Sequence, residues 1–128
     1  MSLQEKAQQP ALTTEQLNDL IIDCIQDIKG KNIVKIDLRH LDEAPTDFFI
    51  ICEGESNTQV QAISNNIYKR LSEEANNKPF HIEGQQNAHW ILLDYFDLVV
   101  HIFYKEARQF YQLEDLWSDG IFTEYSDL

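Results

Sequence analysis

Apolar residues recur every three or four positions in the first part of the chain, with polar residues between them. Thr13 and Gln16 stand just before this stripe at the spacing of a capping box, in which each side chain bonds the other's backbone. The stripe predicts an amphipathic helix and consists of Leu17, Leu20, Ile21, Cys24, Ile25 and Ile28. We expect Gly30 to end this helix in a left-handed conformation, which glycine adopts without steric cost.

The pattern then changes to that of β-strands. Residues 33–38 alternate between apolar and polar side chains, which predicts a strand with one exposed face. Residues 39–46 are polar and include Pro45, so we expect a connecting loop there. Residues 48–52 are short and continuously apolar, which is typical of a central strand covered on both faces.

A second amphipathic helix is predicted after this strand. Ser56 and Gln59 have the spacing of another capping box, and residues 60–75 keep apolar side chains at helical intervals. The preceding turn contains Gly54, and a glycine turn at a helix N-terminus is a possible phosphate site. Glutamates flank Gly54 on both sides and would repel an anion. We therefore favour a plain connection between strand and helix.

The longest apolar runs lie in the last third of the chain. Residues 80–83 predict a short strand that ends at Gly84. Residues 89–103 contain two apolar runs separated by a polar break, with Asp94 and Asp97 on its two sides. Runs of this length around a tight break predict two neighbouring strands of a hairpin, buried on at least one face.

A short C-terminal helix, or two helical turns, is predicted over residues 105–117. The elements in chain order are helix, strand, strand, helix, three strands and helix, which predicts an α/β fold. We expect a single domain with a mixed sheet of about five strands flanked by helices. The predicted boundaries are a disordered N-terminal tail at 1–12, the folded domain at 13–118 and an acidic C-terminal tail at 119–128.

Composition favours a cytoplasmic protein of one domain. The chain has 128 residues, of which 43% are hydrophobic, enough for one sizeable core. No apolar stretch is long enough to span a membrane, and residues 1–10 have no signal-peptide core. Cys24 and Cys52 lie inside apolar segments, as buried thiols do in a reducing compartment.

The net charge of −12 indicates which classes of partner the chain can bind. Such a chain repels polyanions, which disfavours direct binding to nucleic acid. A basic protein partner would be attracted and steered, although the same charge also serves solubility. From Asp94 onward the acids clearly outnumber the bases, so the negative field is strongest toward the C-terminal third.

Catalytic and metal sites find little support in the residue spacing. His81 and Glu83 alternate onto one strand face, but they do not complete a zinc signature with His89 or His101. A magnesium-dependent nucleotide-binding enzyme of the nucleotidyltransferase type is the alternative hypothesis, but it would need paired strand carboxylates that are missing. No nucleophile-elbow motif accompanies His101. We predict no catalytic residue, no metal and no cofactor.

A protein-interaction surface is the favoured hypothesis for the hairpin. Trp90, Tyr95 and Phe96 supply aromatic anchors, and Glu83, Asp94 and Asp97 supply charges that would select a basic partner. The alternative for Trp90 is a place in the core.

The same segments resemble the ribosomal silencing factor family (RsfS, Iojap-like). The similarity begins with DFFIICEGES at 47–56 and continues with IEG at 82–84 and WILLD at 90–94. It ends with DLVVHIF at 97–103 and RQFYQLEDLW at 108–117. The order and spacing of these segments together are specific, and with the first helix they cover roughly residues 15–118.

The resemblance implies a nucleotidyltransferase-like sheet without known catalysis. Members bind the fourteenth protein of the large ribosomal subunit, block joining of the small subunit and so repress translation, and they commonly form homodimers. The family pattern marks Glu83, Trp90, Asp94, Asp97 and His101 as the partner-binding positions, to which we add Tyr95 and Phe96. Trp90 is the expected anchor.

Phe96 departs from the family pattern, which usually has glycine before the second aspartate. A bulky residue lacks glycine's freedom at positive φ. Either the turn differs here or Phe96 adds contact area.

Overall fold

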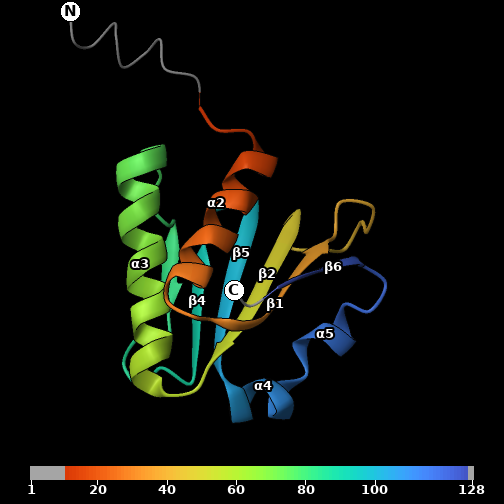
Figure 1. The fold of residues 1–128 in the computed structure, drawn as a ribbon. Coiled ribbons are helices and arrows are strands. Elements are labelled where there is room, and N and C mark those ends of the chain that lie inside the picture. Colours follow the sequence, from red (N-terminus) through yellow and green to blue (C-terminus); the bar gives the residue numbers. More distant parts are fainter. Residues whose placement is uncertain (1–10, 127–128) are drawn as a thin grey trace, which may run out of the picture.

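Six strands form one mixed sheet in the order β3-β4-β5-β2-β1-β6, and the computed structural model describes residues 11–126 of the chain (Figure 1). The strands are β1 (Lys31–Asp37), β2 (Phe48–Gly54), β3 (His81–Glu83), β4 (Trp90–Asp94), β5 (Leu98–Tyr104) and β6 (Ile121–Tyr125). The helices are α2 (Thr14–Asp27), α3 (Asn57–Ala75), α4 (Lys105–Tyr111) and α5 (Leu113–Leu116). Most of the predicted N-terminal tail, residues 1–10, lies outside the described part of the chain.

The sheet confirms the predicted α/β class and its mixed character. β2 and β5 pair in parallel, and every other neighbouring pair is antiparallel. A parallel pair needs a long connection, and α3 lies within the connection between β2 and β5. The predicted hairpin is present, because β4 and β5 pair directly with Trp90 opposite Phe103.

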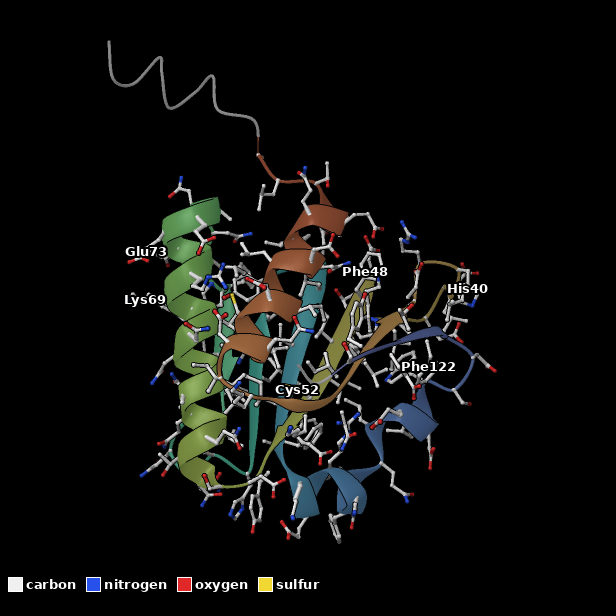
Figure 2. All side chains as sticks on the ribbon, viewed as in Figure 1. His40, Phe48, Cys52, Lys69, Glu73 and Phe122 are labelled. Atoms are coloured by element: carbon white, nitrogen blue, oxygen red, sulfur yellow. The ribbon has the colours of Figure 1, made fainter. Side chains whose placement is uncertain are left out.

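The larger core lies between the sheet and the helices α2 and α3, which cross the sheet side by side (Figure 1). The predicted stripe of the first helix packs here, with Ile21, Cys24 and Ile25 fully buried. Cys52 of β2 joins this core, whereas Lys69 and Glu73 point outward from α3 (Figure 2). β2 is central and covered on both faces, as its apolar run predicts.

A smaller core covers part of the opposite side of the sheet. Leu113 of α5 and the half-buried Trp117 pack against Phe49 and Ile51 of β2 and against β1. The loop between β1 and β2 contributes Leu41 to the same cluster. These elements cover β1 and β2 on this side, whereas much of β3 and β4 stays uncovered.

The first helix begins as predicted and ends differently. Thr13 and Gln16 form a complete capping box, with bonds of 3.0 and 3.1 Å. The left-handed residue at its end is Lys29 (φ 64°), so the prediction for Gly30 was wrong. A Cβ on Gly30 would collide with the Ile25 side chain, which shows that this glycine serves close packing instead.

The second capping box is only half formed. Ser56 accepts the Gln59 N–H at 3.1 Å, but the Gln59 side chain accepts from the backbone of Glu55 at 2.7 Å. Gln59 also donates to the carbonyls of Ile28 and Lys29 at 3.0 and 3.1 Å. This glutamine therefore ties the start of α3 to the end of α2.

Three further details correct or complete the predicted elements. Neither face of the strand at 33–38 is fully exposed. Ile33 is buried on one face, and Val34 and Ile36 are buried on the other. Lys35 and Asp37 are half-buried. The C-terminal helical segment is broken into α4 and α5 at Gln112, which has φ 48°. β6 was not assigned from the sequence; it pairs antiparallel with β1 and adds the sixth strand.

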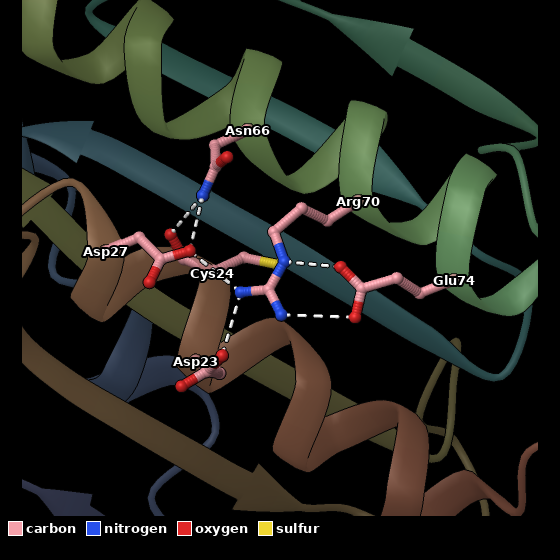
Figure 3. A network of polar contacts seen from close by, with 6 residues as sticks. All are labelled: Asp23, Cys24, Asp27, Asn66, Arg70 and Glu74. Carbon is pink, nitrogen blue, oxygen red and sulfur yellow. Dashed lines mark hydrogen bonds and ion pairs between the residues drawn. The ribbon is translucent and has the colours of Figure 1, made fainter.

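A polar network on the outer side joins α2 to α3 (Figure 3). The Arg70 guanidinium bonds Asp23 at 2.8 Å, Asp27 at 2.7 Å and Glu74 at 2.6 Å. Asn66 donates to the Cys24 carbonyl at 2.8 Å beside it. Hydrogen bonds to the Glu74 and Asp23 carboxylates raise the pKa of Arg70 above its ordinary value. One charged guanidinium therefore holds together three carboxylates that belong to two helices.

No helix within residues 11–126 is both long and apolar enough to cross a membrane.

Candidate partner-binding surface

One side of β3 and β4 is left open by the helices. Along β4, Ile91 and Leu93 point into the larger core, whereas Trp90, Leu92 and Asp94 alternate onto the opposite side and are half-buried. This alternation follows from the two-residue period of a strand.

The neighbouring strand continues this surface with two polar side chains. His81 lies opposite Asp94 and Glu83 lies opposite Leu92, so both share their side of the sheet. The two are exposed and approach each other at 3.1 Å. We call the surface formed by His81, Glu83, Trp90, Leu92 and Asp94 the open face.

Trp90 is held in a defined orientation on this face. Its indole N–H donates to His101 Nδ1 at 3.0 Å. Its ring stacks on Phe103 with centroids 4.9 Å apart, and Tyr111 of α4 approaches it at 4.8 Å. A ring fixed by a hydrogen bond and two aromatic contacts loses little conformational entropy when a partner packs on it.

His101 lies below Trp90 and is only 4% exposed. Burial lowers the pKa of His101 to about 3, so the imidazole is neutral near neutral pH. A neutral ring with Nδ1 accepting from Trp90 carries its proton on Nε2. His101 was predicted to bind the partner, but its burial instead makes it a support for Trp90.

The turn between β4 and β5 keeps positive φ at the position of Phe96. Phe96 has φ 77°, and the Asp97 N–H donates to the Tyr95 carbonyl at 3.0 Å, which is the bond of a γ-turn centred on Phe96. The Asp94 carboxylate accepts the Phe96 N–H at 2.8 Å, and Thr46 donates to the Phe96 carbonyl at 3.0 Å. Phe96 therefore adopts the conformation that glycine favours, although it carries a bulky side chain.

Phe96 itself projects into solvent and is 72% exposed. Its ring meets Phe80, which is 77% exposed, edge to face with centroids 6.1 Å apart. Asp97 follows it and is also exposed. Phe96 and Asp97 border a groove of about 400 Å³ whose other wall is the loop from Leu38 to Asp47.

Tyr95 does not belong to this surface. It is 6% exposed and packs in the larger core, on the other side of the sheet from Trp90. Burial raises the pKa of its phenol. The alternation that brings Asp94 to the open face turns Tyr95 inward, so we correct its predicted role from partner contact to core residue.

The sequence analysis did not assign Leu92, His81 or Phe80 to the partner-binding surface. The signal for Leu92 was available, because it is two residues from both Trp90 and Asp94 and so must share their side of the strand. The place of Phe80 beside Phe96 depends on how β3 pairs with β4, which the sequence does not specify.

The open face is acidic. Glu83 bonds only a histidine, and Asp94 has no ion pair within the described residues. Asp97 at the end of the hairpin likewise has no cationic partner in residues 11–126. These carboxylates are therefore available to a basic partner.

Metal-binding and nucleophilic groups were sought across the described residues. Within residues 11–126, no group of three or more His, Cys, Asp or Glu side chains is placed to hold a metal ion. Burial raises the pKa of Cys24 and of Cys52 to about 12, which disfavours the thiolate that nucleophilic attack needs. The turn at Gly54 is occupied by helix capping and by an ion pair between Glu55 and Lys105 at 3.0 Å.

A cleft of about 610 Å³ lies between the β1–β6 edge and the C-terminal helices. Arg108, 8% exposed, is one of its lining residues and donates to Asn32 O, Glu53 and Glu114 at 2.6, 3.1 and 2.9 Å. This guanidinium joins β1, β2 and α5, so its place in the RQFYQLEDLW segment has a structural explanation.

Comparison with known proteins decides the family. The family profile described as "Ribosomal silencing factor during starvation" (RsfS) matches residues 11–127. The chain is 35% identical over 109 residues to the ribosomal silencing factor RsfS of Halalkalibacterium halodurans, covering 85% of this chain and 92% of that protein. The chain belongs to the ribosomal silencing factor family.

Two further relatives of this silencing factor agree with the assignment. It is 39% identical over 94 residues to the ribosomal silencing factor RsfS of Bacillus subtilis, covering 73% of this chain and 78% of that one. A crystal structure of a protein from Chromobacterium violaceum superposes with a TM-score of 0.78 at 33% identity, covering 84% and 88% of the two chains. The residues that the family profile matches in the silencing factor include the whole open face.

Proposed function

We propose that this silencing factor binds the large ribosomal subunit through its fourteenth ribosomal protein and sterically blocks joining of the small subunit, which represses translation. Family membership supports a role in ribosome silencing. The observation that carries the proposal is the oriented Trp90 on an open face whose carboxylates are not neutralised. The proposed mechanism is binding alone, with no chemical step.

The physics of the open face fits a basic protein partner. Trp90 and Leu92 offer apolar area that is only half-buried in the isolated chain, and tryptophan is a frequent centre of binding energy at interfaces. Glu83 and Asp94 flank this area on a chain with a net charge of −12. A basic surface would therefore be attracted over a distance and oriented before contact.

Co-sedimentation with ribosomal subunits tests the proposal. We expect the unaltered protein to travel with large subunits and not with small ones. Trp90→Ala should weaken this binding by about a hundredfold, the effect of losing a central tryptophan worth some 3 kcal/mol. Tyr68→Ala is the matched control, because Tyr68 is an exposed aromatic residue of α3 on the other side of the sheet.

A charge reversal guards against an effect of misfolding. Glu83 is exposed, and within residues 11–126 its carboxylate forms an ion pair with His81 alone, so Glu83→Lys should leave the fold intact while weakening binding to a basic surface. If both Trp90→Ala and Glu83→Lys bind large subunits like the unaltered protein, the open face is not the binding site.

We also propose that the protein acts in the cytoplasm and forms a homodimer, as the family resemblance implies. Light scattering coupled to size-exclusion chromatography measures the mass directly. A mass equal to that of one chain at micromolar concentration would reject the dimer. That result would leave the proposed binding of the large subunit untouched.

A further inference from the structure

The turn at Phe96 carries two features that each cost stability. Phe96 adopts a positive φ of 77°, which is unfavourable for a residue with a bulky side chain. The same side chain is 72% exposed, so its burial returns little of that cost. A residue that is strained and exposed at once is explained when something else packs on it.

The aromatic pair of Phe80 and Phe96 continues the open face. Trp90 lies at one end of β4 and Asp94 at the other, and the Asp94 carboxylate accepts the Phe96 N–H at 2.8 Å. Phe80 donates its own N–H to the Asp94 carbonyl at 2.7 Å. The pair therefore stands directly beyond the Asp94 end of the surface to which the proposed function assigns the ribosomal partner.

Charge around the pair selects the kind of side chain that fits there. Asp94 adjoins the pair, and Asp42, Asp47 and Asp97 line the groove that Phe96 borders. None of these four carboxylates forms an ion pair within residues 11–126. Arg39, which also lines the groove, is engaged by Asp37 at 2.7 Å.

We infer that Phe80 and Phe96 bind the side chain of an arginine or lysine from the basic partner of the open face. The cation would lie against the Phe96 ring, where the π-system attracts positive charge, with its head directed to the carboxylates of the groove. The aromatic pair thereby extends the contact beyond Trp90. This inference rests on the proposed function and names the partner chemistry at one end of the same surface.

Phe96→Gly separates this role from a structural one. Glycine relieves the strained φ, so the midpoint of urea unfolding should rise. Affinity for purified large ribosomal subunits should nevertheless fall, by about threefold to tenfold, the range of one cation–π contact at a partly exposed site. A purely structural residue would move stability and affinity in the same direction.

Two conservative variants test the aromatic character. Phe96→Tyr keeps the ring and should bind like the unaltered protein. Phe96→Leu keeps apolar size and the strained backbone but removes the π-system, so it should bind as weakly as Phe96→Gly. If Phe96→Leu binds at full strength, the contact is merely apolar and the assignment of a cationic side chain is overturned.

The result for Trp90→Ala distinguishes the two levels of the proposal. If Trp90→Ala loses binding while Phe96→Gly keeps it, only the present inference fails. If Trp90→Ala and Glu83→Lys both keep binding, the open face is not the binding site and the present inference fails with it, and if the unaltered protein does not bind large subunits, the proposed function itself fails. Tyr68→Ser, which removes an exposed aromatic side chain on the other side of the sheet, should change neither affinity nor this comparison.

Discussion

Phe96 shows at the scale of one residue how sequence and structure can disagree locally. The backbone of the turn demands positive φ, and the chain provides phenylalanine instead of glycine. A left-handed conformation costs a residue with a Cβ about 1–2 kcal/mol. The turn persists because Asp94 and Thr46 bond the Phe96 backbone on both sides.

We predict that Phe96→Gly raises the free energy of unfolding by roughly 1 kcal/mol. The gain comes from relief of the strained φ, reduced by the greater freedom of glycine in the unfolded chain and by the lost contact with Phe80. Urea unfolding followed by circular dichroism measures the change. A decrease in stability would mean that the contact with Phe80 outweighs the strain.

His101 predicts how stability depends on pH. Its pKa is near 6.5 in an unfolded chain and about 3 in the folded protein, because burial disfavours the charged ring. Below about pH 6.5 the unfolded chain therefore takes up a proton that the folded chain does not. The free energy of unfolding should fall by about 2 kcal/mol between about pH 6.5 and about pH 5.

Urea unfolding of the unaltered protein and of His101→Gln checks this dependence. The variant cannot take up that proton, so its stability should change less over the same interval. Imidazole ¹⁵N shifts should also show a neutral His101 at about pH 5. The carboxyls of Asp37 and Glu74, whose pKa values are lowered mainly by hydrogen bonds from arginine, add losses only at more acidic pH. A protonated His101 at about pH 5 would contradict this account.

At the scale of elements, α2 and α3 are joined by a charged network as well as by the core. Arg70 bonds carboxylates of both helices, and its side chain is 22% exposed. We predict that Arg70→Met lowers the free energy of unfolding by about 1 kcal/mol, because three carboxylates then repel one another without a cation. Concentrated salt should reduce this loss through screening.

Lys69→Met is the matched control for Arg70→Met. Lys69 is an exposed cation that projects from the same helix (Figure 2). It has no ion pair within the described part of the chain. Removing it should leave stability nearly unchanged at low and at high salt. An equal loss in both variants would assign the effect to net charge instead of to the network.

The elements with the clearest periodicity were the ones that the sequence predicted correctly. The stripe from Leu17 to Ile28 and the run at 48–52 specify a helix and a central strand, and both are present. β6 was missed because its pattern is weak and its place depends on pairing with β1 through a distant register. Gly30 was misassigned because the left-handed position falls one residue earlier, at Lys29, and Gly30 instead packs closely against the preceding Ile25.

The candidate site was predictable only in part, for the same reason. Residues 90–94 alternate, so Trp90 and Asp94 share one side of β4 and Tyr95 is directed inward. The depth of His101 depends on α4 and Tyr111 closing over Trp90, which no local pattern encodes. The neighbours of Phe96 likewise come from Phe80 and from the loop near Thr46, far away in the chain.

At the scale of the whole molecule, the two sides of the sheet have different roles, because one builds the larger core and the other carries the open face. α2 and α3 cover one side of the sheet and build the larger core. On the other side, much of β3 and β4 is not covered by a helix. The net charge of −12 adds a field that favours basic surfaces and disfavours exposed nucleic acid. A sheet that presents an oriented tryptophan beside carboxylates without a lysine or arginine partner in residues 11–126 is suited to occupy a protein surface and exclude a competitor.

Subunit joining in the presence of the purified protein tests the central claim most directly. Large and small ribosomal subunits are mixed at a magnesium concentration that favours association, and joined ribosomes are quantified on sucrose gradients. The account predicts that the unaltered protein reduces joined ribosomes and migrates with the large subunit, and that Trp90→Ala does neither. Undiminished joining with the unaltered protein bound to large subunits, or full inhibition by Trp90→Ala, would contradict it.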